Sequence, residues 1–160
     1  MTHDDYLKLQ IKELIERSNA SLNNPPFPFD FINCLTAFQD YNAIPICASE
    51  KRLLKYINLF NATPNYIENN EVLIIDFSNS VIPTKLPEIW IKRDFKQYRS
   101  VFNDFLKTYM KITTDIPEGY DVDHFFSKEQ VNDSEKYIRL ILLDRSTNRS
   151  HGASFEKARS

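Results

Sequence analysis

The change of hydrophobic period along the chain is the feature that most constrains its fold. Up to about residue 60, apolar residues recur at helical spacing, which predicts helices over 4–18, 30–41 and 49–60. The sequence EVLIIDF at 71–77 is instead a β-branched run bounded by polar residues, and EIWIKR at 88–93 suits a second strand of the same hairpin. Helices first and strands second indicate an α+β fold.

The second half of the chain adds a long helix and a β-β-α order. Apolar and aromatic residues share one face of a helix expected over 94–111, and such a stripe is more often core than a ligand site. A strand at 120–126, a polar connection, a strand at 137–144 and a helix from about Arg149 follow. The last part of the chain is therefore expected to be a small ββα unit.

Composition removes several classes of function. Only two glycines occur, Gly119 and Gly152, so a phosphate-cradling glycine loop is excluded. Cys34 and Cys47 form no CxxC pair, which indicates neither a zinc knuckle nor a disulfide framework, and we expect them to be small buried side chains. No apolar run approaches the roughly 20 residues that span a bilayer, and the N-terminal segment lacks signal-peptide order. We expect a cytoplasmic protein.

Charge is unevenly distributed, although the net charge is only −2. Segments 92–111 and 137–160 are net basic and bracket a net acidic segment, 112–136. This arrangement suits a polyanion held around a cation-binding centre, and it equally suits ordinary solvated faces. The lysines and arginines of the long helix could likewise contact a DNA backbone or simply face solvent.

The acidic segment places Asp123 and His124 side by side within GYDVDHFFSK. A carboxylate is a hard oxygen ligand for Mg²⁺ and an imidazole accepts a proton near pH 7, and phosphodiester hydrolysis uses both groups. Asn148, 24 residues after His124, is a candidate second ligand, because the expected hairpin returns the second strand to the first. Strand alternation sends Asp123 and His124 to opposite faces, so the strand has to bend or end near His124. Taken alone, such a pair is far more often an ordinary polar spot than a catalytic site, and Asn148 could be only a turn or cap residue.

The segment YDVDHFFSKEQVNDSEKYIRLILLDRSTNRSHG resembles the HNH endonuclease motif of the ββα-metal fold, most closely the HNH domain of RNA-guided CRISPR effector nucleases. An Asp-x-Asp-His strand, a polar loop and a second strand ending in an Asn-Arg pair carry the resemblance. It implies that His124 is the general base and that Asp123 and Asn148 hold Mg²⁺, or Mn²⁺ or another divalent cation. The paired CxxC knuckles of many HNH modules are absent from the sequence.

The same resemblance implies further site residues. Asp121 would be a supporting acid near the metal, and His151 occupies a place where some relatives have a third ligand or a basic residue. Arg145 and Arg149 would contact phosphates, as arginine commonly does.

The chain is therefore expected to divide into two parts: a mainly helical N-terminal region with a small β-hairpin, residues 1–115, packed on a C-terminal HNH ββα-metal module, residues 116–160. The implied function is metal-dependent hydrolysis of phosphodiester bonds in DNA, with RNA as the other possible substrate. Family analogy adds a phage or defence setting and a protein partner such as a defence-system ATPase. No membrane partner is expected from the composition, and the oligomeric state is left open. The alternative is a non-catalytic interaction module with a degenerate HNH fold that acts through a protein partner.

Overall fold

The computed structural model describes residues 1–21, 47–80, 85–125 and 128–145, and within these ranges the chain is a mixed α+β protein, as expected. The helices expected over 30–41 and from Arg149 lie outside the described residues. The helices that are described are α1 (His3–Ser21), α3 (Glu50–Leu59) and α4 (Tyr98–Met110), with a short 3-10 helix η1 (Lys128–Gln130). The strands are β1 (Cys47–Ala48), β2 (Thr63–Ile67), β3 (Val72–Asp76), β4 (Glu88–Lys92), β5 (Tyr120–His124) and β6 (Tyr137–Asp144).

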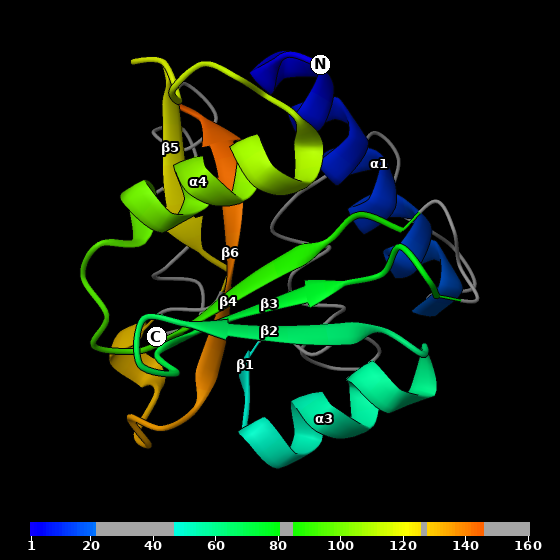
Figure 1. Ribbon diagram of the computed structural model, residues 1–160, viewed down its shortest axis with the longest axis vertical. Helices are drawn as coiled ribbons and strands as arrows, with labels where there is room; N and C mark the ends of the chain where they lie inside the picture. Colours follow the sequence, from blue (N-terminus) through cyan, green and yellow to red (C-terminus); the bar gives the residue numbers. More distant parts are fainter. Residues whose placement is uncertain (22–46, 81–84, 126–127, 146–160) are drawn as a thin grey trace.

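The strands form one curled antiparallel sheet in which β6 changes partners along its length. Tyr137 to Arg139 pair with β4, whereas Leu140 to Asp144 pair with β5. On the other side of β4 follow β3 and then β2, and the short β1 pairs with the beginning of β6. Figure 1 shows β2, β3 and β4 running across the molecule while β5 and the upper part of β6 stand almost upright. The two halves of the sheet are thus joined through one long strand.

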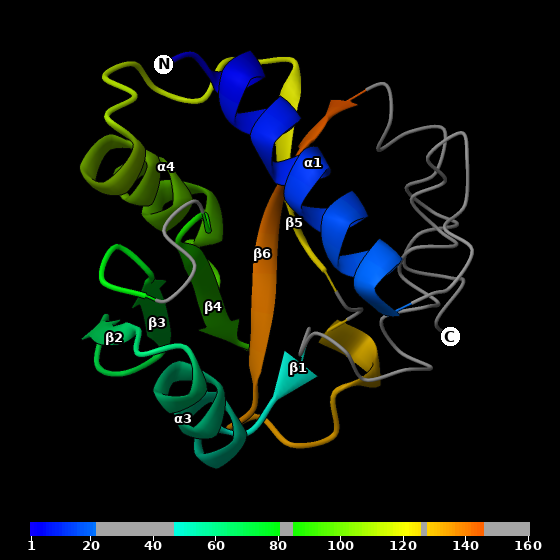
Figure 2. The same cartoon turned by 90° about the vertical axis from the view of Figure 1, so that its right-hand side faces the viewer.

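Helices cover both faces of this sheet, which explains why its central strands are apolar on both sides. One core cluster contains Val72 and Ile74 of β3 together with α4 and Tyr6 of α1. The other contains Leu73 and Ile75 of β3 with α3. Figure 1 shows α1 and α4 above the strands and α3 below them, and Figure 2 shows the same arrangement from the side. The continuous apolar run in β3 is a consequence of this double burial.

The first helix starts at a capping box. The Thr2 hydroxyl accepts a hydrogen bond from the Asp5 main-chain N–H at 3.1 Å, and the Asp5 carboxylate accepts one from the Thr2 N–H at 3.0 Å. Reciprocal bonds of this kind satisfy donors that a helix start leaves free. Ser49 does the same for α3, because its hydroxyl accepts from the Arg52 N–H at 3.3 Å. The expected helices over 4–18 and 49–60 are therefore confirmed, with only their ends adjusted.

The helix expected over 94–111 is shorter than its apolar spacing suggested and begins at Tyr98. Phe95 is buried, but its N–H donates to the Lys92 carbonyl in a turn that leaves β4. At the other end, Lys111 adopts a left-handed conformation, with φ of 58°, and stops the helix. Phe95 thus contributes to the core from the connection before α4.

The N-terminal part contains more sheet than the hairpin expected at 71–77 and 88–93. That hairpin is confirmed as β3 and β4, and β2 extends it by a further antiparallel strand. Asn69 and Asn70 form the tight connection from β2 to β3 with φ of 54° and 67°, a conformation that asparagine tolerates. In the described part of the chain, none of the helices combines the length and apolar character that crossing a membrane requires. The division into regions 1–115 and 116–160 stays a prediction, because β6 shares hydrogen bonds with strands of both regions.

Beyond the point where β4 and β6 diverge, α1 lies next to β6 in place of β4. The Gln10 side chain donates to the Leu142 carbonyl at 2.7 Å and accepts from the Leu142 N–H at 2.9 Å. Gln10 is 1% exposed, so these bonds satisfy two main-chain groups that water does not reach. The Gln10 side chain thus makes the two main-chain hydrogen bonds that a neighbouring strand would otherwise make with Leu142, and these bonds attach α1 to β6.

Candidate active site

His124 is the last residue of β5 and lies opposite Leu140 of β6. Its side chain is 4% exposed, and its ring packs edge-on against the ring of Tyr98, with the centroids 4.9 Å apart. Tyr98 is the first residue of α4, so the imidazole is enclosed between the sheet and the beginning of that helix. The strand ends at His124, but His124 is still part of it and therefore still alternates with Asp123.

Burial controls the protonation of His124. Loss of hydration, and to a smaller extent the positive charge of Lys128, lowers the pKa of its imidazole from 6.5 to about 4. The ring is therefore neutral at neutral pH, which is the form that accepts a proton. Among the described residues, no group forms a hydrogen bond with its buried Nε2 atom. A neutral imidazole can accept a proton, but a pKa of about 4 makes it a weak base at neutral pH, and the buried ring packs against Tyr98.

Asp123 belongs to the opposite face of β5, because successive side chains of a strand alternate. Its Oδ1 atom accepts a hydrogen bond of 2.8 Å from the main-chain N–H of His124. Asp121, two residues earlier on the same face, has its Oδ1 atom 3.4 Å from a guanidinium nitrogen of Arg145. The structure thus brings Asp121 and Arg145 together, and it keeps the side chains of Asp123 and His124 on different faces.

The register of β5 and β6 determines what can approach Asp123. Tyr120 lies opposite Asp144, and the Arg145 N–H donates to the Gly119 carbonyl at 2.7 Å. The end of β6 therefore lies beside the beginning of β5, not beside Asp123 as we had expected, because antiparallel pairing reverses the order of residues. Gly119 and Asp123 are four residues apart, about 13 Å along a strand. Asn148, Arg149 and His151 lie outside the described residues.

The described residues fit a divalent cation only in part. Asp121 and Asp123 present carboxylate oxygens, the ligand class that Mg²⁺ prefers, on one face of β5. Over residues 1–21, 47–80, 85–125 and 128–145, no group of three or more acidic, histidine or cysteine side chains is arranged to hold a metal ion. The other two proposed ligands, Asn148 and His151, belong to the segment after Arg145.

The sequence interpretation missed a buried cluster of charges at the fork between β4 and β6. The Glu88 carboxylate accepts hydrogen bonds from the Lys85 ammonium at 2.5 Å, the Tyr56 hydroxyl at 2.8 Å and the Trp90 indole at 3.1 Å. The Lys85 ammonium also donates to Glu13 of α1 at 2.9 Å. The charged residues interrupt apolar strand sequences, EIWI and YIRLILL, and that interruption was the signal available.

Arg139 completes this cluster and connects it to β5. Its guanidinium is 2% exposed, and its Nη1 atom lies 3.8 Å from the Glu88 carboxylate, an ion pair beyond hydrogen-bond distance. Within the part of the chain that is described, Nε and Nη1 of Arg139 have no hydrogen-bond partner. Arg139 faces the same side of β6 as Ile141, the residue opposite Asp123. The sheet face that carries Asp123 therefore continues into a buried cationic group.

No protein-family model matches this chain, and the comparisons with curated proteins and with solved structures found no match either.

Proposed function

We propose that this protein is a metal-dependent endonuclease of the HNH type that hydrolyses phosphodiester bonds in DNA. The observation that carries the proposal is the state of His124, a neutral imidazole with an unpartnered Nε2 atom at the end of a strand that pairs with β6. The resemblance of DVDH and of the NRSHG segment to the HNH motif supports it. In this proposal β5, β6 and the segment after Arg145 form the ββα module, and the N-terminal strands and helices support it.

Each site residue has its own role in the proposed reaction. His124 accepts the proton of the attacking water, while the bond from its own main-chain N–H to Asp123 fixes the end of β5. A Mg²⁺ ion held by Asp123 and Asn148, with Asp121 and His151 in support, would stabilise negative charge on the scissile phosphate and on the leaving oxygen. Arg145 and Arg149 bind phosphate oxygens, and Asp121 orients the Arg145 guanidinium toward them.

The structure sets a condition for this chemistry. The Nε2 atom is buried and the ring of Tyr98 packs edge-on against the imidazole, so water reaches Nε2 only after a rearrangement around His124, and we propose that Tyr98 turns away in it. Tyr98 is half-buried, and no hydrogen bond of its hydroxyl is found within the described ranges, so rotation of the ring breaks packing contacts but no strong polar bond. We propose that substrate binding provides the displacement.

The burial of His124 also favours a second candidate function, a non-catalytic interaction module. A buried histidine packed on an aromatic ring, with the neighbouring acid on the opposite face, is what a structural role would give. In that case the HNH-like segment serves the fold, and the protein acts by binding a partner protein. Metal-dependent cleavage separates the two functions.

The test is a nicking assay on supercoiled plasmid DNA with Mg²⁺ or Mn²⁺ and, in parallel, with EDTA. The nuclease proposal predicts nicking that requires the ion and that is lost in Asp123→Asn. Lys51→Gln, a change on the exposed face of α3, is the control and should cleave as the native protein does. Native protein that cleaves neither DNA nor RNA with any divalent ion would establish the interaction module as the better account.

A further inference from the structure

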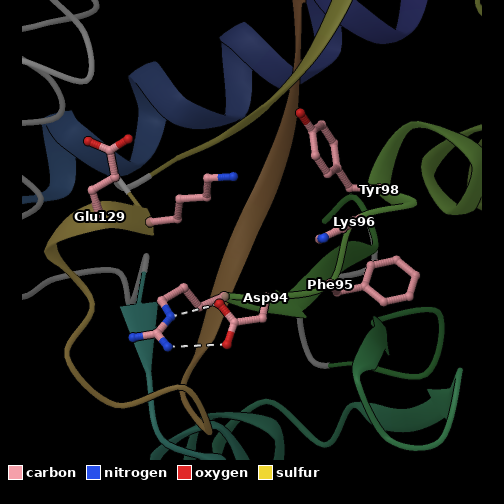
Figure 3. Close-up of a pocket in the computed structure, with 7 residues that line it drawn as sticks. Asp94, Phe95, Lys96, Tyr98 and Glu129 are labelled. Atoms are coloured by element: carbon pink, nitrogen blue, oxygen red, sulfur yellow. Dashed lines mark hydrogen bonds and ion pairs between the residues drawn. The ribbon is translucent and has the colours of Figure 1, made fainter.

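A pocket of about 710 Å³ lies where β4 and β5 end. Both strands run antiparallel to β6, so their carboxyl ends point the same way and the segments that follow them meet. One wall is the connection from β4 to α4, with Arg93, Asp94, Phe95, Lys96 and Tyr98, and the other is η1, with Lys128 and Glu129. Figure 3 shows Glu129 across the pocket from Lys96 and Tyr98.

The charges of this pocket are only partly neutralised. The guanidinium of Arg93 donates to both oxygens of Asp94, at 3.0 and 3.1 Å, and to the Val131 carbonyl at 2.8 Å. Figure 3 shows the two hydrogen bonds to Asp94 as dashed lines. Lys96 and Lys128 are exposed, and no hydrogen bond or ion pair of either is found among the residues that the structure describes. The pocket therefore carries three cations, Arg93, Lys96 and Lys128, against two carboxylates, Asp94 and Glu129.

The two lysines act on the same space although they come from different elements. The pKa of the Asp94 carboxyl lies below its usual value, first because of the hydrogen bonds from Arg93 and then because of the charges of Lys128 and Lys96. The positive charge of Lys128 also lowers the pKa of His124. An anion between the two ammonium groups would thus lie close to the end of β5, separated from His124 by the ring of Tyr98.

We propose that this pocket binds a backbone phosphate of a DNA strand, with Lys96 and Lys128 as its two cationic contacts. The hydroxyl of Tyr98, which lines the pocket, is available as a hydrogen-bond donor to the same phosphate. The start of α4 adds its main-chain N–H groups, since Gln97 makes no side-chain cap. The choice of DNA as the carrier rests on the proposed nuclease function, whereas the phosphate site rests on the pocket alone.

Binding without cleavage tests this inference separately from the nuclease proposal. Fluorescence anisotropy of a short labelled single-stranded oligodeoxynucleotide is measured in EDTA over a range of salt concentrations. For Lys96→Gln with Lys128→Gln we expect about tenfold weaker binding and a salt slope that is lower by about 1.4, since each phosphate contact contributes about 0.7 for a single strand. The matched control, Lys51→Gln with Lys55→Gln, removes the same charge from α3 and should keep the native slope. Equal losses in both double variants would overturn the proposal.

Glu129→Gln gives a test of opposite sign. Removing the carboxylate of Glu129, which lines the pocket together with the two lysines, should strengthen oligodeoxynucleotide binding, because it removes repulsion from the phosphate. All of these side chains are exposed, so the fold is not at risk. Weaker binding by Glu129→Gln would overturn the proposal.

The source of the phosphate is identified by NMR. Addition of the oligodeoxynucleotide in EDTA should shift the amide signals of Lys96, Tyr98 and Lys128. Shifts with inorganic phosphate or thymidine monophosphate but none with the oligodeoxynucleotide would overturn DNA as the carrier, and no shift with any of them would overturn the site. Shifts with the oligodeoxynucleotide in a protein that cleaves nothing would uphold the pocket and refute the nuclease.

Discussion

The burial of His124 makes the stability of the protein depend on pH in a defined direction. Its imidazole titrates near pH 6.5 in the unfolded chain and at about 4 in the folded one. Above pH 6.5 the ring is neutral in both states. As the pH falls from 6.5 to 4, the unfolded chain binds a proton that the folded chain excludes, so the free energy of unfolding decreases. Stability from this group is fully present above pH 6.5 and is lost as the pH approaches 4.

The size of this effect follows from the separation of the two pKa values. Each pKa unit is equivalent to about 1.4 kcal/mol, so this histidine should remove about 3 kcal/mol of stability between neutral pH and pH 4. That is a large fraction of the 5–15 kcal/mol that typically stabilises a domain. His124→Phe keeps a ring against Tyr98 and cannot titrate, which makes it the matched variant.

Urea denaturation of the native protein and of His124→Phe across this pH range measures the effect as a difference. Carboxylates and other histidines titrate in both proteins and cancel. The stability of the native protein relative to His124→Phe should fall by about 3 kcal/mol as the pH is lowered. His3→Phe is the control at another buried histidine, for which burial lowers the pKa and Asp4 partly restores it. A native-minus-variant difference that does not change with pH would refute the burial of His124 and the assignment of a neutral ring.

Three further predictions concern stability and are measured by urea denaturation. Gln10→Ala should cost about 2–5 kcal/mol, because it leaves the buried N–H and carbonyl of Leu142 without partners, and a cost below about 1 kcal/mol would contradict that pairing. Glu88→Gln should cost about 3–5 kcal/mol, because it removes the buried negative charge that lies between Lys85 and Arg139 and leaves Glu13 as the partner of Lys85, and unchanged stability would show that this cluster does not stabilise the region where β4 and β6 diverge. Lys111→Gly should stabilise by about 0.5–1 kcal/mol, because glycine adopts the left-handed conformation without strain, and a loss would speak against that helix end.

Local signals in the sequence predicted the elements that depend on few distant contacts. The apolar run at 137–144 is β6 residue for residue, and the first helix lies where its period placed it. β2 was missed because Thr63–Ile67 is an edge strand that contains Pro64 and shows no alternation of apolar and polar residues. The strand pattern also carried no sign that β6 changes partners after Arg139, since that change depends on how α1 packs.

The sequence likewise predicted only those features of the candidate site that depend on local strand geometry. The alternation of strand residues correctly placed Asp123 and His124 on opposite faces, and β5 ends at His124. The enclosure of His124 was not predictable, because it depends on where α4 begins and on the direction of the Tyr98 ring. The pocket beside it combines Lys96 and Lys128, which are far apart in sequence and meet only because β4 and β5 are both antiparallel to β6.

The role of His124 as general base is tested most directly by chemical rescue of cleavage. Single-turnover rates of plasmid nicking with Mg²⁺ are compared for the native protein, His124→Ala and His3→Ala, each with and without added imidazole. A general base contributes about 10²–10⁴-fold, so His124→Ala should lose that factor and regain part of it with imidazole, while His3→Ala keeps the native rate. A His124→Ala protein that remains folded and nicks at the native rate would contradict the account.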